Sequence, residues 1–269
     1  MSSVISQLFS FDFMRRAFLA ILIISPLFGM VGTMIVQKKM AYFSDALGHS
    51  ALTGIAIGVI FGISNTNVSM VIFAVIFALL LNNISRKGLA SKDTLISVFA
   101  SCATAIGLAI LSRGGSFANY SALLVGDILS ITGKEIAELV ILFVIMIAYW
   151  LWAVNRLTAI SIHPVLAKSR SISVRAMEDI FAVLMALLVM LSIKWVGILL
   201  INALLILPAA SSRNISVNMR EYTFYSILFS VFSGLVGLTV SYFTDMATGP
   251  MIVIIASVIY FCTYLYGKK

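Results

Sequence analysis

Long apolar stretches separated by short polar segments follow one another along nearly the whole chain. A bilayer core of about 30 Å is crossed by roughly 20 helical residues, or fewer where the helix ends reach the interface. Stretches of this kind cover residues 17–36, 40–63, 68–84, 94–111, 139–154, 222–243 and 251–266. The pattern predicts an all-α fold, a polytopic transmembrane bundle of about eight or nine helices, in a single domain over residues 1–269.

One apolar stretch, residues 180–210, is too long for an ordinary single crossing. Lys194 and Gly197 interrupt it, so we expect two short helices joined by a tight turn. This gives nine crossings, or eight if the two helices count as one, and the distribution of basic residues favours nine. Residues 121–131 are apolar but too short to span a bilayer, and we expect a re-entrant or surface segment there.

The composition agrees with a membrane protein. Hydrophobic residues make up 61% of the chain and charged residues only 10%, whereas a soluble domain carries about a quarter charged residues. So few charges could not cover the surface of a soluble domain. Cys102 and Cys262 lie inside apolar stretches without metal-ligand spacing, and we expect them to be buried thiols.

The net charge of +8 is better explained by orientation in the membrane than by nucleic-acid binding, because the basic residues are scattered. If the segment after the first span is cytoplasmic, the opposite side holds only five of the 18 Lys and Arg residues, which are Arg15, Arg16, Arg113, Lys134 and Lys194. Positive charge gathers on the cytoplasmic side. The N-terminus is therefore predicted outside, with the C-terminus and the hydrophilic loop at residues 155–179 in the cytoplasm.

Asp45 and His49 are costly residues to place inside a predicted span. Their spacing puts both on one face of a helix, where they provide half of a tetrahedral site for zinc or a similar divalent cation. Two copies of the pair across a two-fold axis would supply four ligands. The alternative is a hydrogen bond that only satisfies two buried polar groups. Small neighbours would allow a second copy to approach closely, namely Ser44, Ala46, Gly48, Ser50 and Ala51.

The loop at residues 155–179 contains Pro164, which suits the first turn of a short helix. Taken alone, this is a solvated loop, and His163 is an ordinary exposed histidine. The sequence has no motif for nucleophilic catalysis, metalloprotease activity or phosphate binding. The chain is therefore not expected to be an enzyme, and any ATP that drives it is bound elsewhere.

Three blocks of sequence resemble one known family. Residues 40–58 contain Ser-Asp-Ala-Leu-Gly-His-Ser, residues 123–132 contain Gly-Asp-Ile-Leu, and residues 196–210 end in Leu-Pro-Ala-Ala. In this order they resemble the permease subunits of bacterial zinc and manganese ABC importers, the ABC-3 metal permease family. The resemblance covers nearly the whole chain.

The resemblance implies a homodimer in the bacterial cytoplasmic membrane, two cytoplasmic ATP-binding subunits and an external metal-binding protein or lipoprotein. It also implies that Asp45 and His49 line the metal path. The segment that docks on the ATPase would include His163, Pro164, Ala167 and Ser171. The family usually has Asp where this chain has His163, and Gly where it has Ser171.

The resemblance favours zinc as the transported ion, with no permanently bound cofactor. Manganese and iron members commonly have Pro where this chain has Thr53. Manganese or iron import by the same mechanism remains the alternative. From other classes, a secondary metal/proton exchanger could use the same pair with Asp93 as a proton relay. An intramembrane enzyme would need a nucleophile or facing acids, and neither is found.

Overall fold

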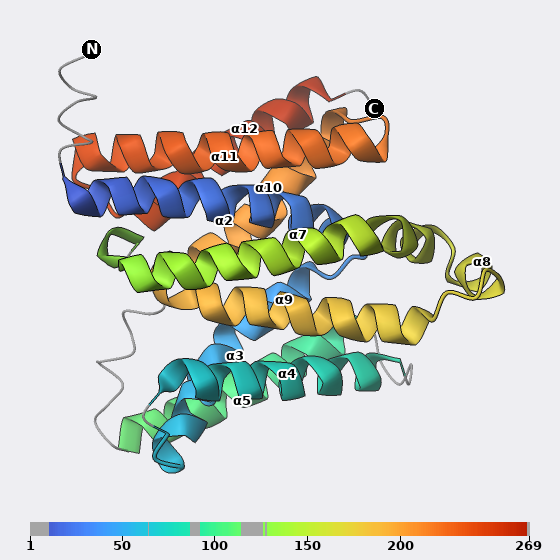
Figure 1. Cartoon of the computed structure of the whole chain (residues 1–269), viewed down its shortest axis with the longest axis horizontal. Coiled ribbons are helices and arrows are strands. Elements are labelled where there is room, and N and C mark those ends of the chain that lie inside the picture. The colour runs from blue at the N-terminus through green and yellow to red at the C-terminus, as the bar shows by residue number, and fades with distance from the viewer. Residues whose placement is uncertain (1–10, 64, 87–91, 114–125, 127, 268–269) are drawn as a thin grey trace. The chain divides into compact units, whose positions relative to one another are not determined.

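The computed structural model describes residues 11–63, 65–86, 92–113, 126 and 128–267, and within these ranges it contains helices and no strand. Figure 1 shows the helices in chain order: α2 (Asp12–Gln37), α3 (Ala41–Ile60), α4 (Thr66–Ser85), α5 (Lys92–Arg113), η1 (Ile128–Ser130), α7 (Gly133–Ile162), α8 (Pro164–Ser169), α9 (Val174–Val196), α10 (Ile198–Ile215), α11 (Met219–Thr244) and α12 (Thr248–Tyr266). The predicted all-α fold is confirmed.

Eight of these helices are long and apolar enough to cross a membrane, and α10 contributes a shorter apolar helix, Leu200–Ile215. The predicted break in the longest apolar stretch is confirmed, because α9 ends at Val196 and α10 begins at Ile198. Gly197 between them has φ 78° and ψ 157°, a backbone conformation open almost only to glycine. The segment expected to be re-entrant lies mostly outside the described residues, and its described part contains the single turn η1.

By its internal contacts the chain divides into two compact units. The first unit comprises residues 1–37, 125–149 and 195–269, and the second comprises residues 38–124 and 150–194. In the first unit, α2, α10, α11 and α12 pack against one another. Small residues bring their backbones close: the Ser226 hydroxyl of α11 donates a hydrogen bond of 2.6 Å to the Gly29 carbonyl of α2, as is common between membrane helices.

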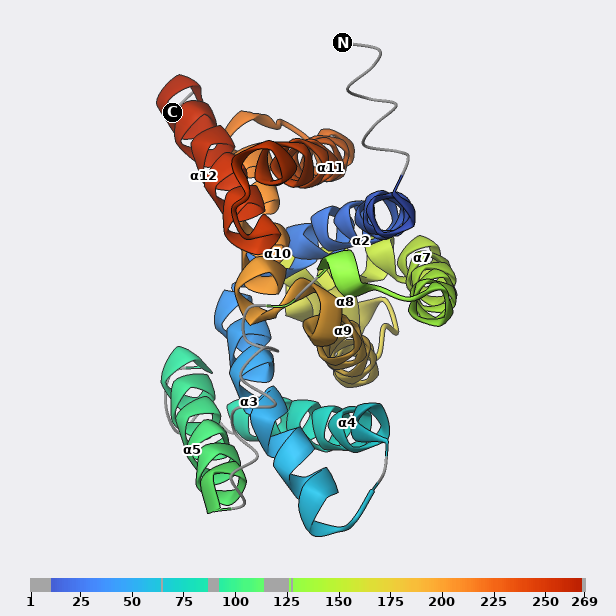
Figure 2. The ribbon, with the colours of Figure 1, turned by 90° about the vertical axis from the view of Figure 1, so that its left-hand side faces the viewer.

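In the second unit, α3 packs against α4 and against α5 (Figure 2). Side-chain hydroxyls connect these helices too. Ser69 of α4 donates to the carbonyl of Gly54 in α3, and Thr53 of α3 donates to the carbonyl of Ala103 in α5. The helix that carries Asp45 and His49 is therefore held on two sides.

Helix α7 is longer than the span predicted for it. Its 30 residues extend for about 45 Å, so they exceed a hydrocarbon core of about 30 Å. Residues 155–162, expected at the start of a loop, continue the helix instead. The guanidinium of Arg156 lies 4.3 Å from the centre of the Trp152 ring one turn earlier, an arrangement suited to an interfacial helix end.

The prediction that both cysteines are buried is wrong, because Cys102 on α5 and Cys262 on α12 are exposed on the surface of the chain. In a soluble protein, a residue within an apolar stretch of sequence is usually buried. In a membrane protein the outer faces of helices are apolar as well, because lipid replaces the core as their surroundings.

Candidate metal path and docking helix

Asp45 and His49 lie on the same face of α3, as their spacing predicts. The Nε2 atom of His49 is 3.5 Å from the Oδ1 atom of Asp45, and each side chain is 50% exposed. The two groups therefore contact each other without being enclosed by the chain.

A pocket of about 440 Å³ opens beside the pair, and α5 forms its other wall. Three hydroxyl residues of α5, Ser97, Ser101 and Thr104, line the pocket opposite Asp45 and His49. These three residues were not among those predicted from the sequence. Their spacing of four and three residues places them on one helix face, and hydroxyls at that spacing in an apolar span are the signal that could have revealed them.

The described residues of one copy bring together only part of a metal site. Among the described residues, no group of three or more His, Cys, Asp and Glu side chains gathers in one place. Asp45 and His49 can supply two ligands, and the α5 hydroxyls can hold water molecules that complete a hydrated cation.

The small residues next to the pair do not form the surface that a second copy would meet. All are buried within the chain, which corrects the expectation for Ser44, Ala46, Gly48, Ser50 and Ala51. The reason is the rotation of α3, whose small face packs against its own neighbours while the face with Asp45 and His49 is left open.

Thr53 lies in the interface between α3 and α5. It is 4% exposed, and its hydroxyl donates to the carbonyl of Ala103, so it joins the two helices that form the pocket instead of lining the pocket itself. Asp93, the candidate proton relay, lies in the first turn of α5, and its side chain is outside the described part of the structure.

The predicted docking segment folds as a short helix. Pro164 occupies the first turn of α8, as expected, and the exposed His163 precedes it with an extended backbone. The helix is closed by a Schellman motif, in which the amide of Ile172 donates to the carbonyl of Ala167 (3.2 Å) and the amide of Ser171 to that of Lys168 (3.0 Å).

Ser171 has φ 58°, in the left-handed region. Glycine is the usual residue at this position of the motif, which accounts for the glycine common in the family that the chain resembles. Ala167 is buried, whereas Ile162, Val165 and Leu166 are exposed. The four predicted docking residues thus lie on α8 or directly beside it, and the helix has an apolar outer surface. The three exposed apolar side chains were not among the residues predicted from the sequence.

Comparison with known proteins shows the family. The family model of the ABC 3 transport family matches residues 10–267. The chain belongs to the ABC 3 transport family. As a member of the ABC 3 family it is the multi-pass permease subunit of an ABC transporter. Such permeases work with a separate ATP-binding subunit, which hydrolyses ATP, and with a substrate-binding protein.

Different relatives of this ABC 3 permease are named for the transport of different metal ions. It is 30% identical to the high-affinity zinc uptake system membrane protein ZnuB of Haemophilus influenzae, over 93% of this chain and 96% of that protein. It is 25% identical to the manganese transport system membrane protein MntC of Listeria monocytogenes, over 97% of this chain and 93% of that protein.

The fold agrees with a solved structure of PsaBC from Streptococcus pneumoniae in complex with Fab. The TM-score is 0.86 at 24% identity, with 98% of this chain and 95% of that chain covered. Two of the three sequence blocks that resembled the family also meet in the ABC 3 permease, because Gly126 lies against Val196 and Gly197.

Proposed function

We propose that this permease is the transmembrane subunit of an ATP-driven importer for divalent metal ions, most favourably zinc. The cation passes between two copies of the chain along a path lined by Asp45 and His49. The observation that supports this proposal is the half-exposed pair, 3.5 Å apart, facing the hydroxyl-lined wall of α5.

Zinc is favoured by the ligands and by the relatives. Imidazole suits zinc, and carboxylate accepts both zinc and manganese. The relative at 30% identity is named for zinc uptake. Manganese is the second candidate, because a path with several oxygen groups, including Ser97, Ser101 and Thr104, suits a harder ion, and relatives at 25% identity are named for manganese transport.

A homodimer is supported by the two ligands that the described residues of one copy bring together. Ionisable side chains facing lipid in a membrane span are expensive, so they face other protein or a water-filled path. Two copies of the Asp45–His49 pair across a two-fold axis supply four ligands, the number that zinc prefers. A site assembled in this way binds modestly, and a cation on a transport path has to be released.

The ATP-binding subunit acts on the permease through α8. Its exposed apolar residues, Val165 and Leu166, and the residues predicted for docking, His163, Pro164, Ala167 and Ser171, form the element on which the ATP-binding subunit docks. For the ATP-binding subunit to reach it, α8 has to lie in the cytoplasm. With nine crossings, the C-terminus is then also cytoplasmic and the N-terminus is outside. An external metal-binding protein delivers the cation, and ATP-driven motion then opens the inner side.

The test is uptake by the assembled transporter in proteoliposomes, comparing radioactive zinc with radioactive manganese. Asp45→Ala and His49→Ala are expected to lose uptake and still assemble with the ATP-binding subunit. Ser112→Ala is the matched control, because Ser112 is an exposed hydroxyl residue of α5 outside the pocket. Normal uptake by both site variants refutes the site, and faster manganese than zinc uptake at equal concentration refutes the assignment of zinc.

The exchanger is tested in the same vesicles. Uptake by the permease alone, driven by a pH gradient in the absence of ATP and of the ATP-binding subunit, would favour the exchanger over ATP-driven import.

A further inference from the structure

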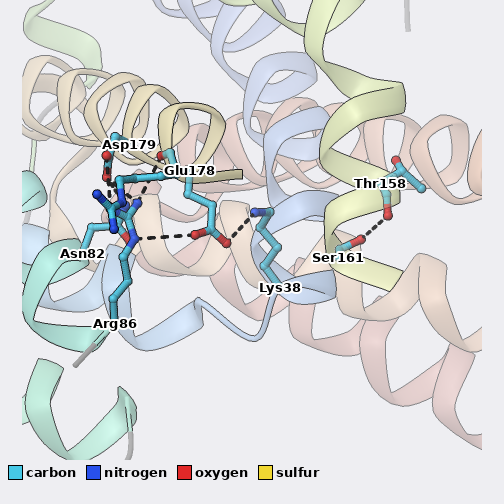
Figure 3. Close-up of polar contacts among 8 residues, drawn as sticks. Lys38, Asn82, Arg86, Thr158, Ser161, Glu178 and Asp179 are labelled. Atoms are coloured by element: carbon cyan, nitrogen blue, oxygen red, sulfur yellow. Dashed lines mark hydrogen bonds and ion pairs between the residues drawn. The ribbon is translucent and has the colours of Figure 1, made fainter. Parts of the chain in front are cut away.

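A cluster of charged and polar side chains in the second unit connects the start of α9 to the end of α4 and to the turn before α3 (Figure 3). The guanidinium of Arg86 binds the carboxylate of Asp179 through two contacts, Nη1–Oδ2 of 3.2 Å and Nη2–Oδ1 of 2.6 Å. Asn82 donates to the same carboxylate at 2.6 Å, and Arg86 also donates to the carbonyl of Arg175 at 3.1 Å. These bonds fix the first turns of α9 to α4.

Glu178 extends the cluster to a third element. Its carboxylate lies 3.8 Å from Nε of Arg86 and 3.6 Å from Nζ of Lys38. The Lys38 side chain is only 6% exposed, and its ammonium lies 5.8 Å from the centre of the Phe181 ring. An ion pair this well shielded from water is screened little and is costly to break.

The cluster lies between the two functional elements in the chain. On one side, residues 170–173 are all that separate α8 from α9, and the Schellman motif at Ser171 makes this connection a defined turn. On the other side, Lys38 stands three residues before α3, and Asp45 and His49 lie in the first half of that helix. Helix α8 is therefore joined to α9 by a short turn, and α9 is joined to the start of the helix with Asp45 and His49 through Glu178 and Lys38.

We propose that Glu178 and Lys38 are positioning residues that transmit the ATP-driven movement of α8 to α3. This inference rests on the proposed function. Neither side chain binds the cation or the ATP-binding subunit. The pair makes α9 and α3 move together, so that the ligands Asp45 and His49 shift when the docking helix is displaced. The Arg86–Asp179 contact anchors α9 and keeps the geometry of the pair.

The experiment measures uptake of radioactive zinc and ATP hydrolysis side by side in the complete transporter, with the external metal-binding protein present. The variants are Glu178→Gln and Lys38→Met, which leave the Arg86–Asp179 anchor intact, and the conservative Lys38→Arg. Asp12→Asn is the matched control, since it makes the same acid-to-amide change at a helix start where the side chain is 81% exposed.

We expect Glu178→Gln and Lys38→Met to assemble, bind zinc and hydrolyse ATP, while zinc uptake per ATP hydrolysed falls by roughly two- to thirty-fold, the range for residues that change coupling between sites. Lys38→Arg should restore much of the ratio, and Asp12→Asn should leave it unchanged.

An unchanged ratio in both variants overturns the inference. A parallel loss of assembly, hydrolysis and uptake also overturns it, because that is the result of a purely structural role. Failure of the proposed function looks different, since it leaves zinc uptake intact in Asp45→Ala and His49→Ala.

Discussion

Replacing Gly126 with alanine is expected to destabilise the permease by two separable effects. Gly126 has φ 71°, where an L residue is strained. A Cβ atom there would also overlap the backbone of Val196 and Gly197, which forms the break between α9 and α10. The left-handed conformation costs about 1–2 kcal/mol for a residue other than glycine, and overpacking against backbone costs about 1–3 kcal/mol more. The expected total is about 2–5 kcal/mol.

Two other glycines separate these effects. Gly62 has φ 64° but open space around its Cβ position, and Gly133 has neither a positive φ nor a close neighbour. Gly62→Ala therefore reports the backbone cost alone, about 1–2 kcal/mol. Gly133→Ala lies at the start of α7 and should be neutral or slightly stabilising, since alanine has the higher helix propensity.

The assay is thermal unfolding of the purified permease in detergent, with all three variants measured at one scan rate because such unfolding is often irreversible. For a chain of this size, each kcal/mol lowers Tm by about 2–4 °C. The Tm of Gly126→Ala should fall on the order of 10 °C, that of Gly62→Ala by a few degrees, and that of Gly133→Ala should not fall. If Gly126→Ala is no less stable than Gly62→Ala, the contact with the α9–α10 break is refuted.

Three further changes test other parts of the fold. Ser171→Gly removes the left-handed strain at the end of α8 and should raise stability by up to about 1 kcal/mol, seen as slower proteolysis of the docking segment; faster cleavage would contradict this. Thr53→Val removes the hydroxyl that joins α3 to α5 and should cost about 0.6 kcal/mol, a small fall in Tm with weaker zinc binding in the adjoining pocket. Ser226→Ala removes the hydrogen bond to Gly29 and should lower Tm by as much as Thr53→Val does, while leaving zinc binding unchanged. An equal loss of zinc binding in the two variants would refute the specific role of Thr53.

The helices themselves could be predicted from the sequence because the membrane imposes a length. A span needs about 20 apolar residues, and every backbone group has to be satisfied within it. The expected spans at residues 68–84 and 94–111 therefore agree closely with α4 and α5. Gly197 could be recognised as a break because the uninterrupted helix would be too long, and Pro164 as a helix start because its missing amide costs nothing there.

The direction in which each helix face points could not be predicted in this way. Spacing placed Asp45 and His49 on one face of α3, but only the packing of the folded chain decides that this face is open and that Ser44 and Ala51 are buried. The same holds for Cys102, which an apolar sequence suggested was buried. In a membrane span the inner and outer faces are both apolar, so hydrophobicity does not fix the rotation of a helix.

The cluster around Arg86 was missed for a related reason. Asn82, Arg86, Glu178 and Asp179 lie at helix ends, where polar residues are expected at the membrane surface whatever their role. Their meeting depends on contacts between segments far apart in the chain, and the sequence provides no signal for that.

The half-exposed Asp45–His49 pair has a consequence for how the protein is made in a cell. Under the proposed homodimer, a newly inserted chain without its second copy presents a carboxylate and an imidazole at the open face of α3, where lipid cannot solvate them. Such a chain is recognisable as an orphan subunit, and membrane quality control has a physical feature by which to remove it. Under the proposed function, the same two residues that bind the cation would also shorten the lifetime of unassembled copies.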